Sequence, residues 1–190
     1  MPRDYSESLL RSGIIDAKAG EKDTARRYLD ILAGAYMVRV LPPWFENLKK
    51  RQVRAPKIYI RDSGILHELL QLASLQDVLG HPKLGASWEG FALEHVLSVL
   101  NTRDAYYWAT HGGAELDLLI FSSGRRFGFE FKFADAPSLA RSMNVALQDL
   151  QLNHLWIVYP GSEIYRLHER ITAIPLHVVN DPNKMPTEFP

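Results

Sequence analysis

The sequence contains no cysteine among its 190 residues, and this absence removes several classes of chemistry. A disulfide framework, a thiol nucleophile and a cysteine-bound zinc ion all need a side chain that the chain does not have. No apolar run approaches the roughly 20 residues that a membrane-spanning helix requires, and the N-terminus is charged rather than signal-like. The composition therefore predicts a folded cytoplasmic protein with no membrane segment.

Two ligand-binding motifs are also missing. The phosphate-binding string G-x-x-x-x-G-K-[ST] does not occur, so we expect no ATP binding by these residues. The seven histidines include no pair at the i, i+4 spacing that is typical of a helical zinc site. The sequence therefore excludes an ATPase site and a helical histidine-zinc site.

The chain has no net charge, but its charges are unevenly distributed. It holds 22 basic and 22 acidic residues, and the segment 49–61 contains basic side chains without any acid among them. A basic segment between two strands is either a wing that follows nucleic-acid phosphates or a solvated loop, and both interpretations are open. In the first interpretation, the residues that contact nucleic acid are Lys49, Lys50, Arg51 and Arg54.

The first half of the chain has the periodicities of a small region with helices and two strands. Two strands around a basic loop after a helix are similar to a winged helix. A glycine- and proline-containing segment at 79–84 then predicts a boundary between a winged-helix-like region at 1–79 and a domain at 80–190. The elements predicted before the boundary are helices at 5–15, 24–35 and 62–72 and strands at 37–41 and 57–61.

Beyond the boundary, strands and helices alternate. This order predicts an α/β (α+β) fold in which a mixed β-sheet is flanked by helices. Apolar and polar residues alternate in 114–121 and 127–133, and Ser123 and Gly124 lie at the centre of the link between them. We therefore predict a hairpin whose phenylalanines, together with Leu116 and Leu118, face the core while its charged residues face the other way.

The hairpin turn fixes which residues lie opposite each other. A link centred on Ser123 and Gly124 places Asp117 opposite Glu130 and Glu115 opposite Lys132. Opposed side chains lie roughly 4.5–5.5 Å apart at Cβ, so two carboxylates there repel each other unless a cation lies between them. The apolar pairs predicted by the same register are Leu118 with Phe129 and Leu116 with Phe131.

Two interpretations of these charges are open. In the first, Asp117 and Glu130 bind Mg²⁺ or Mn²⁺, and Lys132 holds the attacking water or stabilises charge on a phosphate. In the second, Glu115 and Lys132 form an ion pair across the strands, and the other two acids are solvated.

A helix predicted at 86–100 places a further acid near this hairpin. Glu89 lies on the row of the helix that continues with apolar residues, so its carboxylate needs a partner or has a raised pKa. Glu89 is then either a site residue or a helix-edge acid that reaches solvent. Glu94 lies on the side of Gly90 and Ser98, where we predict a solvated side chain.

Several strings of residues resemble a known family over 24–178. The resemblance is to the uncharacterised C-terminal domain of prokaryotic AAA-type ATPases, which is similar to the PD-(D/E)xK nuclease superfamily. The chain itself lacks the ATPase module that these domains normally follow, so it is either a fragment or a naturally shortened relative. The matching strings are residues 28–32, 40–44, 56–64, 85–91, 106–108, 111–117 and 129–132.

The resemblance implies a role for each residue of the predicted site. Glu89 corresponds to the acid on the first core helix, Asp117 to the metal-binding aspartate, and Glu130 and Lys132 to the E-x-K strand. The implied metal ligands are Asp117, Glu130 and Glu89, together with the carbonyl of Phe131. Because the superfamily also contains members that bind without cutting, two functions are open. One is a nucleic-acid-binding nuclease, and the other is a non-catalytic module that docks to an ATPase, a partner protein or DNA.

Overall fold

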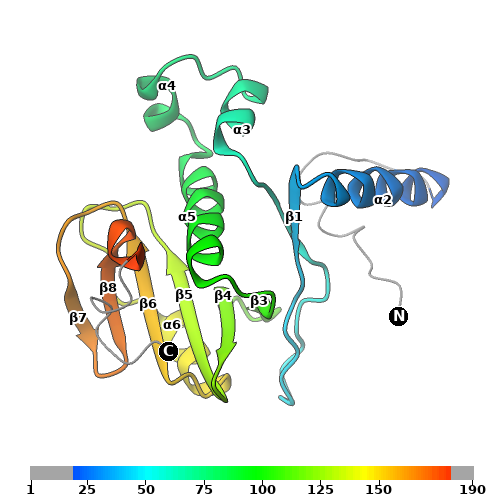
Figure 1. Ribbon diagram of the computed structural model, residues 1–190. Coiled ribbons are helices and arrows are strands. Elements are labelled where there is room, and N and C mark those ends of the chain that lie inside the picture. The colour runs from blue at the N-terminus through cyan, green and yellow to red at the C-terminus, as the bar shows by residue number, and fades with distance from the viewer. Residues whose placement is uncertain (1–18, 181–190) are drawn as a thin grey trace.

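A computed structural model describes residues 19–180 of the chain, and its centre is a six-stranded mixed sheet (Figure 1). The strand order is β3-β4-β5-β6-β8-β7. Neighbouring strands are antiparallel from β3 to β5, parallel from β5 through β6 to β8, and antiparallel between β8 and β7. The strands are β3 (Ala105–Ala109), β4 (Glu115–Ser122), β5 (Arg125–Phe131), β6 (His154–Tyr159), β7 (Tyr165–His168) and β8 (Ile171–Pro175).

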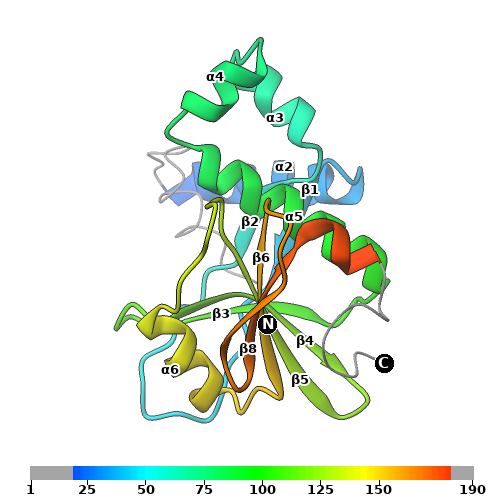
Figure 2. The same cartoon turned by 90° about the vertical axis from the view of Figure 1, so that its left-hand side faces the viewer.

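Helices cover both faces of the sheet, which confirms the predicted mixed sheet flanked by helices (Figure 2). Helix α5 (Leu84–Leu100) and the 3-10 helix η1 (Leu176–Asn180) pack on one face, and α6 (Arg141–Asp149) packs on the other. Every residue of the central strand β6 is buried, because both of its faces are covered by helices. Within residues 19–180, no helix combines the length and the apolar character needed to cross a bilayer.

The region before the sheet contains the helices predicted at 24–35 and 62–72 and the two strands predicted between them. Helix α2 (Ala19–Gly34) leads into β1 (Val38–Leu41) and β2 (Lys57–Ile60), which form a separate antiparallel pair. Helices α3 (Ser63–Leu69) and α4 (Leu75–Gly80) then connect to α5, and Asp62 caps α3 by accepting two backbone amides. The helix predicted at 5–15 lies outside the described residues.

The connection between β1 and β2 lies along the outer edge of the sheet. The amide of Trp44 donates to the carbonyl of Tyr107 at 2.7 Å, and the amide of Val53 donates to the carbonyl of Ala109 at 2.9 Å. The backbone of this connection therefore bonds to the edge strand β3. The two strands and the sheet are thus joined by hydrogen bonds as well as by the chain.

The β4–β5 hairpin has the predicted turn, and the predicted register is confirmed from Leu118 to Ser122. The described ladder does not extend to the other predicted pairs, which are Leu116 with Phe131, Asp117 with Glu130 and Glu115 with Lys132. Ser123 and Gly124 both have positive φ, as a two-residue turn of type I′ requires, and Leu118 lies opposite Phe129. The prediction that Leu116 and Leu118 share a face is wrong. A bulge shifts the pairing of β4 with β3 between Leu119 and Leu116, so Leu116 packs with the α6 face and Leu118 with the α5 face.

Candidate functional site

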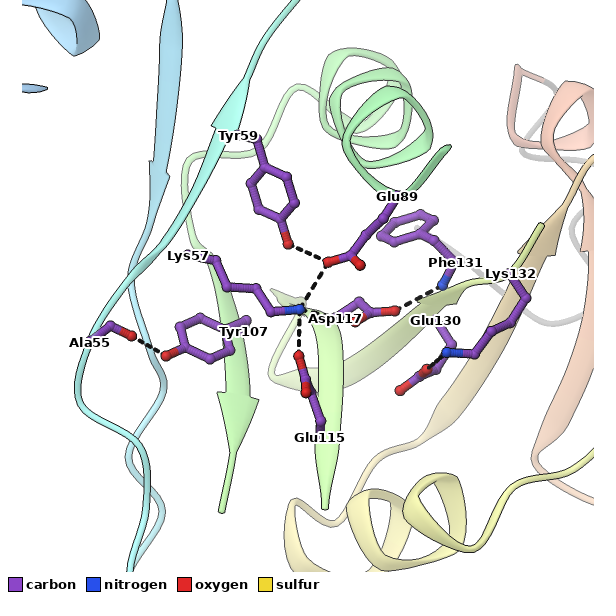
Figure 3. Close-up of polar contacts among 10 residues, drawn as sticks. All are labelled: Ala55, Lys57, Tyr59, Glu89, Tyr107, Glu115, Asp117, Glu130, Phe131 and Lys132. Carbon is purple, nitrogen blue, oxygen red and sulfur yellow. Dashed lines mark hydrogen bonds and ion pairs between the residues drawn. The ribbon is translucent and has the colours of Figure 1, made fainter. Parts of the chain in front are cut away.

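The four residues predicted from sequence gather between α5, β4 and β5 (Figure 3). Glu89 comes from the first half of α5, Asp117 from β4 beside its bulge, and Glu130 from the end of β5. Lys132 follows β5 directly, and its Nζ lies 2.9 Å from Oε2 of Glu130. We call Glu89, Glu115, Asp117 and Glu130 the acid cluster.

Asp117 is the acid that the strands hold most firmly. The residue is 5% exposed, and its Oδ2 accepts a hydrogen bond from the backbone amide of Phe131 at 3.1 Å. The described ladder between β4 and β5 reaches only as far as Leu118 and Phe129 on this side, because beyond the bulge β4 follows β3. The amide of Phe131 therefore donates to the side chain of Asp117 instead of to a backbone carbonyl of β4. This hydrogen bond fixes Asp117 beside β5.

Lys57 enters the cluster from β2. Its Nζ lies 2.9 Å from Oε1 of Glu89, 2.5 Å from Oε1 of Glu115 and 3.1 Å from Oδ1 of Asp117. Burial alone lowers the pKa of Lys57, but attraction to Asp117 and the other acids outweighs burial, and the net pKa is well above its usual value. The ammonium is therefore charged at neutral pH. Tyr59, two residues further along β2, donates its hydroxyl to Oε1 of Glu89 at 2.5 Å.

Glu130 has a different environment. It is 3% exposed, and although Oε2 contacts Lys132, its Oε1 is buried without a hydrogen-bond partner in the described part of the chain. Burial, and then repulsion from Asp117, raise the pKa of Glu130 to about 8 despite the nearby Lys132. A buried carboxylate in this state is stabilised by a further cation or by a proton.

The two glutamates of α5 both have basic partners. Burial, and then repulsion from Asp117, raise the pKa of Glu89, which agrees with the prediction that this acid needs a partner. The prediction that Glu94 is solvated is wrong. Its side chain is 13% exposed and bonds to Arg39 of β1, with Nη2 2.9 Å from Oε2, and to Arg61, with Nε 2.9 Å from Oε2. The interpretation in which Glu115 pairs with Lys132 and the other two acids are solvated is wrong. Glu115 contacts Lys57, Lys132 contacts Glu130, and both Asp117 and Glu130 are buried.

Two acids of this site carry oxygen atoms of the kind that bind a divalent cation. Within residues 19–180, no three acidic or histidine side chains converge closely enough to hold a metal ion by themselves. Mg²⁺ is, however, usually bound through one or two protein carboxylates plus water and substrate phosphate. Asp117 and Glu130 supply that number, and the unpartnered Oε1 of Glu130 supplies the desolvated oxygen that such an ion would neutralise.

The predicted nucleic-acid residues lie apart from this cluster. All four are exposed on the connection between β1 and β2. Lys50 forms an ion pair with Asp149 of α6 at 2.6 Å, and the carbonyl of Arg51 accepts the amide of His111. The structure therefore brings one lysine of the basic segment 49–61 into the acid cluster, and that residue is Lys57.

Sequence reasoning did not assign Lys57 and Tyr59 to the site. Their contacts with α5 and β4 span from 30 to 60 residues along the chain, so no local periodicity reveals them. One signal was available, because a basic segment without acids precedes a helix that carries two glutamates. A cavity of about 620 Å³ lies beside these contacts and is lined by residues of β2, α3, α5 and β3.

Comparisons with known proteins identify the families that the chain resembles. Residues 84–179 match the family described as Domain of unknown function (DUF4143), and residues 5–76 match Domain of unknown function (DUF8612). Two relatives are the Uncharacterized protein Mb2031c of Mycobacterium bovis and the Uncharacterized protein Rv2008c of Mycobacterium tuberculosis. Each is 53% identical over 152 residues, which cover 80% of this chain and 34% of the relative. The chain thus spans about a third of the length of these relatives, and no solved structure matches it significantly.

Proposed function

Since the chain belongs to the DUF4143 family of domains of unknown function, its activity has to be inferred from its site, and we propose a nuclease-like, nucleic-acid-binding module. In this proposal it hydrolyses phosphodiesters with Mg²⁺ or Mn²⁺. The relationship to the PD-(D/E)xK superfamily, the winged-helix-like region at 1–79 and the association with an ATPase module belong to the same proposal. The division into 1–79 and 80–190 stays a prediction.

One observation carries the proposal, and it is the environment of Glu130. Burying a carboxylate oxygen without a partner is costly, and a second carboxylate nearby increases the cost. The Oε1 of Glu130 is in this situation, with Asp117 close enough to raise its pKa. Perturbed acids of this kind are characteristic of functional sites. A bound cation would stabilise both carboxylates.

Each residue has a role that follows from its contacts. Asp117 and Glu130, with the carbonyl of Phe131, would hold the ion, which when bound polarises the phosphate and lowers the pKa of water. The amide of Phe131 orients Asp117. Lys132, with its Nζ at Glu130 and its side chain partly exposed, holds the attacking water or stabilises charge on the phosphate oxygens.

Thermal melts with and without millimolar Mn²⁺ or Mg²⁺ test whether the metal site exists. An ion present at 100 times its Kd stabilises the folded protein by about 2.7 kcal/mol. We expect the wild type to melt at a higher temperature with the ion, and Asp117→Asn to lose this increase. Asp104→Asn, at an exposed aspartate just before β3, is the matched control and should keep it. The same increase in Asp117→Asn as in the wild type would rule out this site.

Cleavage assays on single- and double-stranded DNA and RNA test the activity. We expect Mn²⁺-dependent cleavage by the wild type and by Arg103→Ala, which removes an exposed basic residue. Lys132→Ala should lose at least tenfold in rate, because the ammonium beside Glu130 is gone. Absence of cleavage of all four substrates would leave the metal-binding result intact and overturn the nuclease activity.

A second candidate function is a docking module that does not cleave. The contacts of Lys57 with Glu89, Glu115 and Asp117 favour it, because these acids are then members of an ion-pair network. In that case metal ions leave the melting temperature unchanged, and Asp117→Asn destabilises the protein with or without them.

A further inference from the structure

We propose that Lys57 is the resident cation of the acid cluster, so that the site binds one divalent ion, at Asp117 and Glu130, rather than two. The inference rests on the proposed function and specifies it. In this arrangement the ammonium of Lys57 takes the position between Glu89 and Asp117 that a second metal ion would need. Glu89 is then a partner of Lys57 and not a metal ligand.

The hydrogen-bonding capacity of Lys57 is matched by its surroundings. An ammonium group has three N–H donors and no acceptor. Three carboxylates, from Glu89, Glu115 and Asp117, lie within 2.5–3.1 Å of Nζ, one for each donor. Figure 3 shows Nζ at the centre of these three acids, which come from two different elements. The side chain of Lys57 therefore satisfies this part of the cluster without a metal ion.

Neighbouring contacts hold Lys57 in this position. Tyr59, which lies on the same face of β2, donates to Glu89, and the hydroxyl of Tyr107 donates to the carbonyl of Ala55 just before β2. The Nζ of Lys57 also lies 5.6 Å from the centroid of the Tyr107 ring, within the range of a cation–π contact. Contacts from β2 and from β3 thus hold the lysine in place.

The acids of the cluster form two groups, according to whether Lys57 contacts them. Glu89 and Glu115 contact Lys57, whereas Glu130 has an oxygen without a partner in the described chain. Asp117 lies between the two groups, and its two oxygens each retain lone-pair capacity beyond the contacts with Lys57 and the Phe131 amide. The carboxylate oxygens best able to bind an ion are therefore those of Asp117 and Glu130.

Charge balance gives the same number of ions. When an ion is bound and all four acids of the cluster are ionised, they carry four negative charges, and Lys57 and Lys132 compensate two of them. One divalent ion compensates the remaining two. A second divalent ion would leave two uncompensated positive charges in a largely buried site, which is costly.

Mn²⁺ binding measured by calorimetry and by electron paramagnetic resonance tests the inference through stoichiometry. We expect one ion per wild-type chain. Lys57→Met releases Glu89, Glu115 and Asp117 from their shared cation, and should bind two ions per chain. Lys57→Arg keeps the charge and should bind one. Lys50→Met, which removes an ion-paired lysine of the connection between β1 and β2, outside the cluster, should also bind one.

The melting temperature without metal is the second readout. Lys57→Met should melt lower than the wild type, because three carboxylates then repel one another, and Mn²⁺ should raise its melting temperature by more than it raises that of the wild type. Glu89→Gln should change the Mn²⁺ affinity less than threefold, whereas Glu130→Gln should weaken it at least tenfold.

The outcomes separate this inference from the proposed function. The proposed role of Lys57 would be wrong if the wild type bound two ions, or if Lys57→Met bound one ion with unchanged affinity. Neither result would contradict the metal site itself. No binding by the wild type would overturn the metal site itself, and the inference with it. The wild-type measurement decides between these results even if Lys57→Met does not fold.

Discussion

The six-stranded sheet and the β1–β2 pair depend on apolar packing and on charge in different proportions, and the acid cluster lies where they meet. The sheet has apolar side chains packed against both faces. The strand pair contributes Leu41 and the partly buried Tyr59 to one of these cores, and it also reaches α5 and β4 through ion pairs of Arg39, Lys57 and Arg61. Salt and acid weaken ion pairs but have little effect on apolar burial. The sheet therefore fixes Asp117 and Glu130, while the position of the Lys57 ammonium depends on charge.

The core of the sheet gives the largest predicted effect. Phe129 is completely buried on β5 against the α5 face, so Phe129→Ala should lower the free energy of unfolding by about 3–5 kcal/mol. Urea denaturation measures this loss. The control is Leu69→Ala at a largely exposed position of α3, which we expect to change the stability by less than about 0.5 kcal/mol. Equal losses in the two variants would contradict the distinction between the sheet and the region before it.

Acid should destabilise the sheet through His154. Burial, and then the positive charges of Arg166 and Arg170, lower the pKa of this histidine to about 4 from an ordinary value of 6.5. Between these values the unfolded chain binds a proton that the folded chain does not, so this stability is present above pH 6.5 and is lost as the pH falls toward 4. The loss amounts to roughly 3 kcal/mol or less.

Urea midpoints between pH 7 and pH 4.5 measure the contribution of His154. His154→Gln, whose amide can replace the ring nitrogen that lies 3.0 Å from the Thr172 hydroxyl, should have a flatter pH dependence than the wild type. Parallel curves for the two proteins would mean that His154 does not bind the proton.

The attachment of the strand pair gives a smaller effect that depends on salt. Glu94→Gln leaves Arg39 and Arg61 without their shared carboxylate, and should cost about 1–2 kcal/mol at low ionic strength. In 1 M NaCl the difference from the wild type should shrink, in contrast to the loss in Phe129→Ala. Glu68→Gln, at an exposed glutamate of α3, is the control. A salt-independent loss in Glu94→Gln would show that packing and not charge holds the pair.

The smallest predicted effect is at the ion pair between Lys50 and Asp149. Exposed pairs of this kind contribute about 0.2–1 kcal/mol, because water and salt screen them. A double-mutant cycle with Lys50→Ala and Asp149→Ala measures the coupling energy. A coupling energy above 2 kcal/mol would show that the connection between β1 and β2 is held as firmly as the sheet, and not by weak, screened charges.

Local pattern predicted the parts of the fold that depend on neighbours in sequence. The alternation around Phe127 and the Ser123–Gly124 turn were sufficient for the register of the β4–β5 hairpin, and this register was confirmed from Leu118 to Ser122. The bulge in β4 was not predicted, because it depends on pairing with β3, whose sequence carries no signal for the shift. The face of Leu116 was wrong for this reason.

Contacts between the two halves of the chain could not be predicted from periodicity. Glu94 has a solvated position on the helix considered alone, and it is partly buried only because Arg39 and Arg61 are brought to it by the strand pair. Lys57 reaches Asp117 for the same reason. The need of Glu89 for a partner was predicted from its row on the helix, but the partner itself was not.

The connection laid along β3 has a consequence for association with other chains. Open strand edges are where one protein can add a strand to the sheet of another and begin to aggregate. At the β3 edge, backbone groups of Pro42, Trp44 and Val53 are already bonded to the strand. At the opposite edge, β7 has four residues and its pairing with β8 is irregular near His168. The sheet is thus protected at both borders against growth by strand addition.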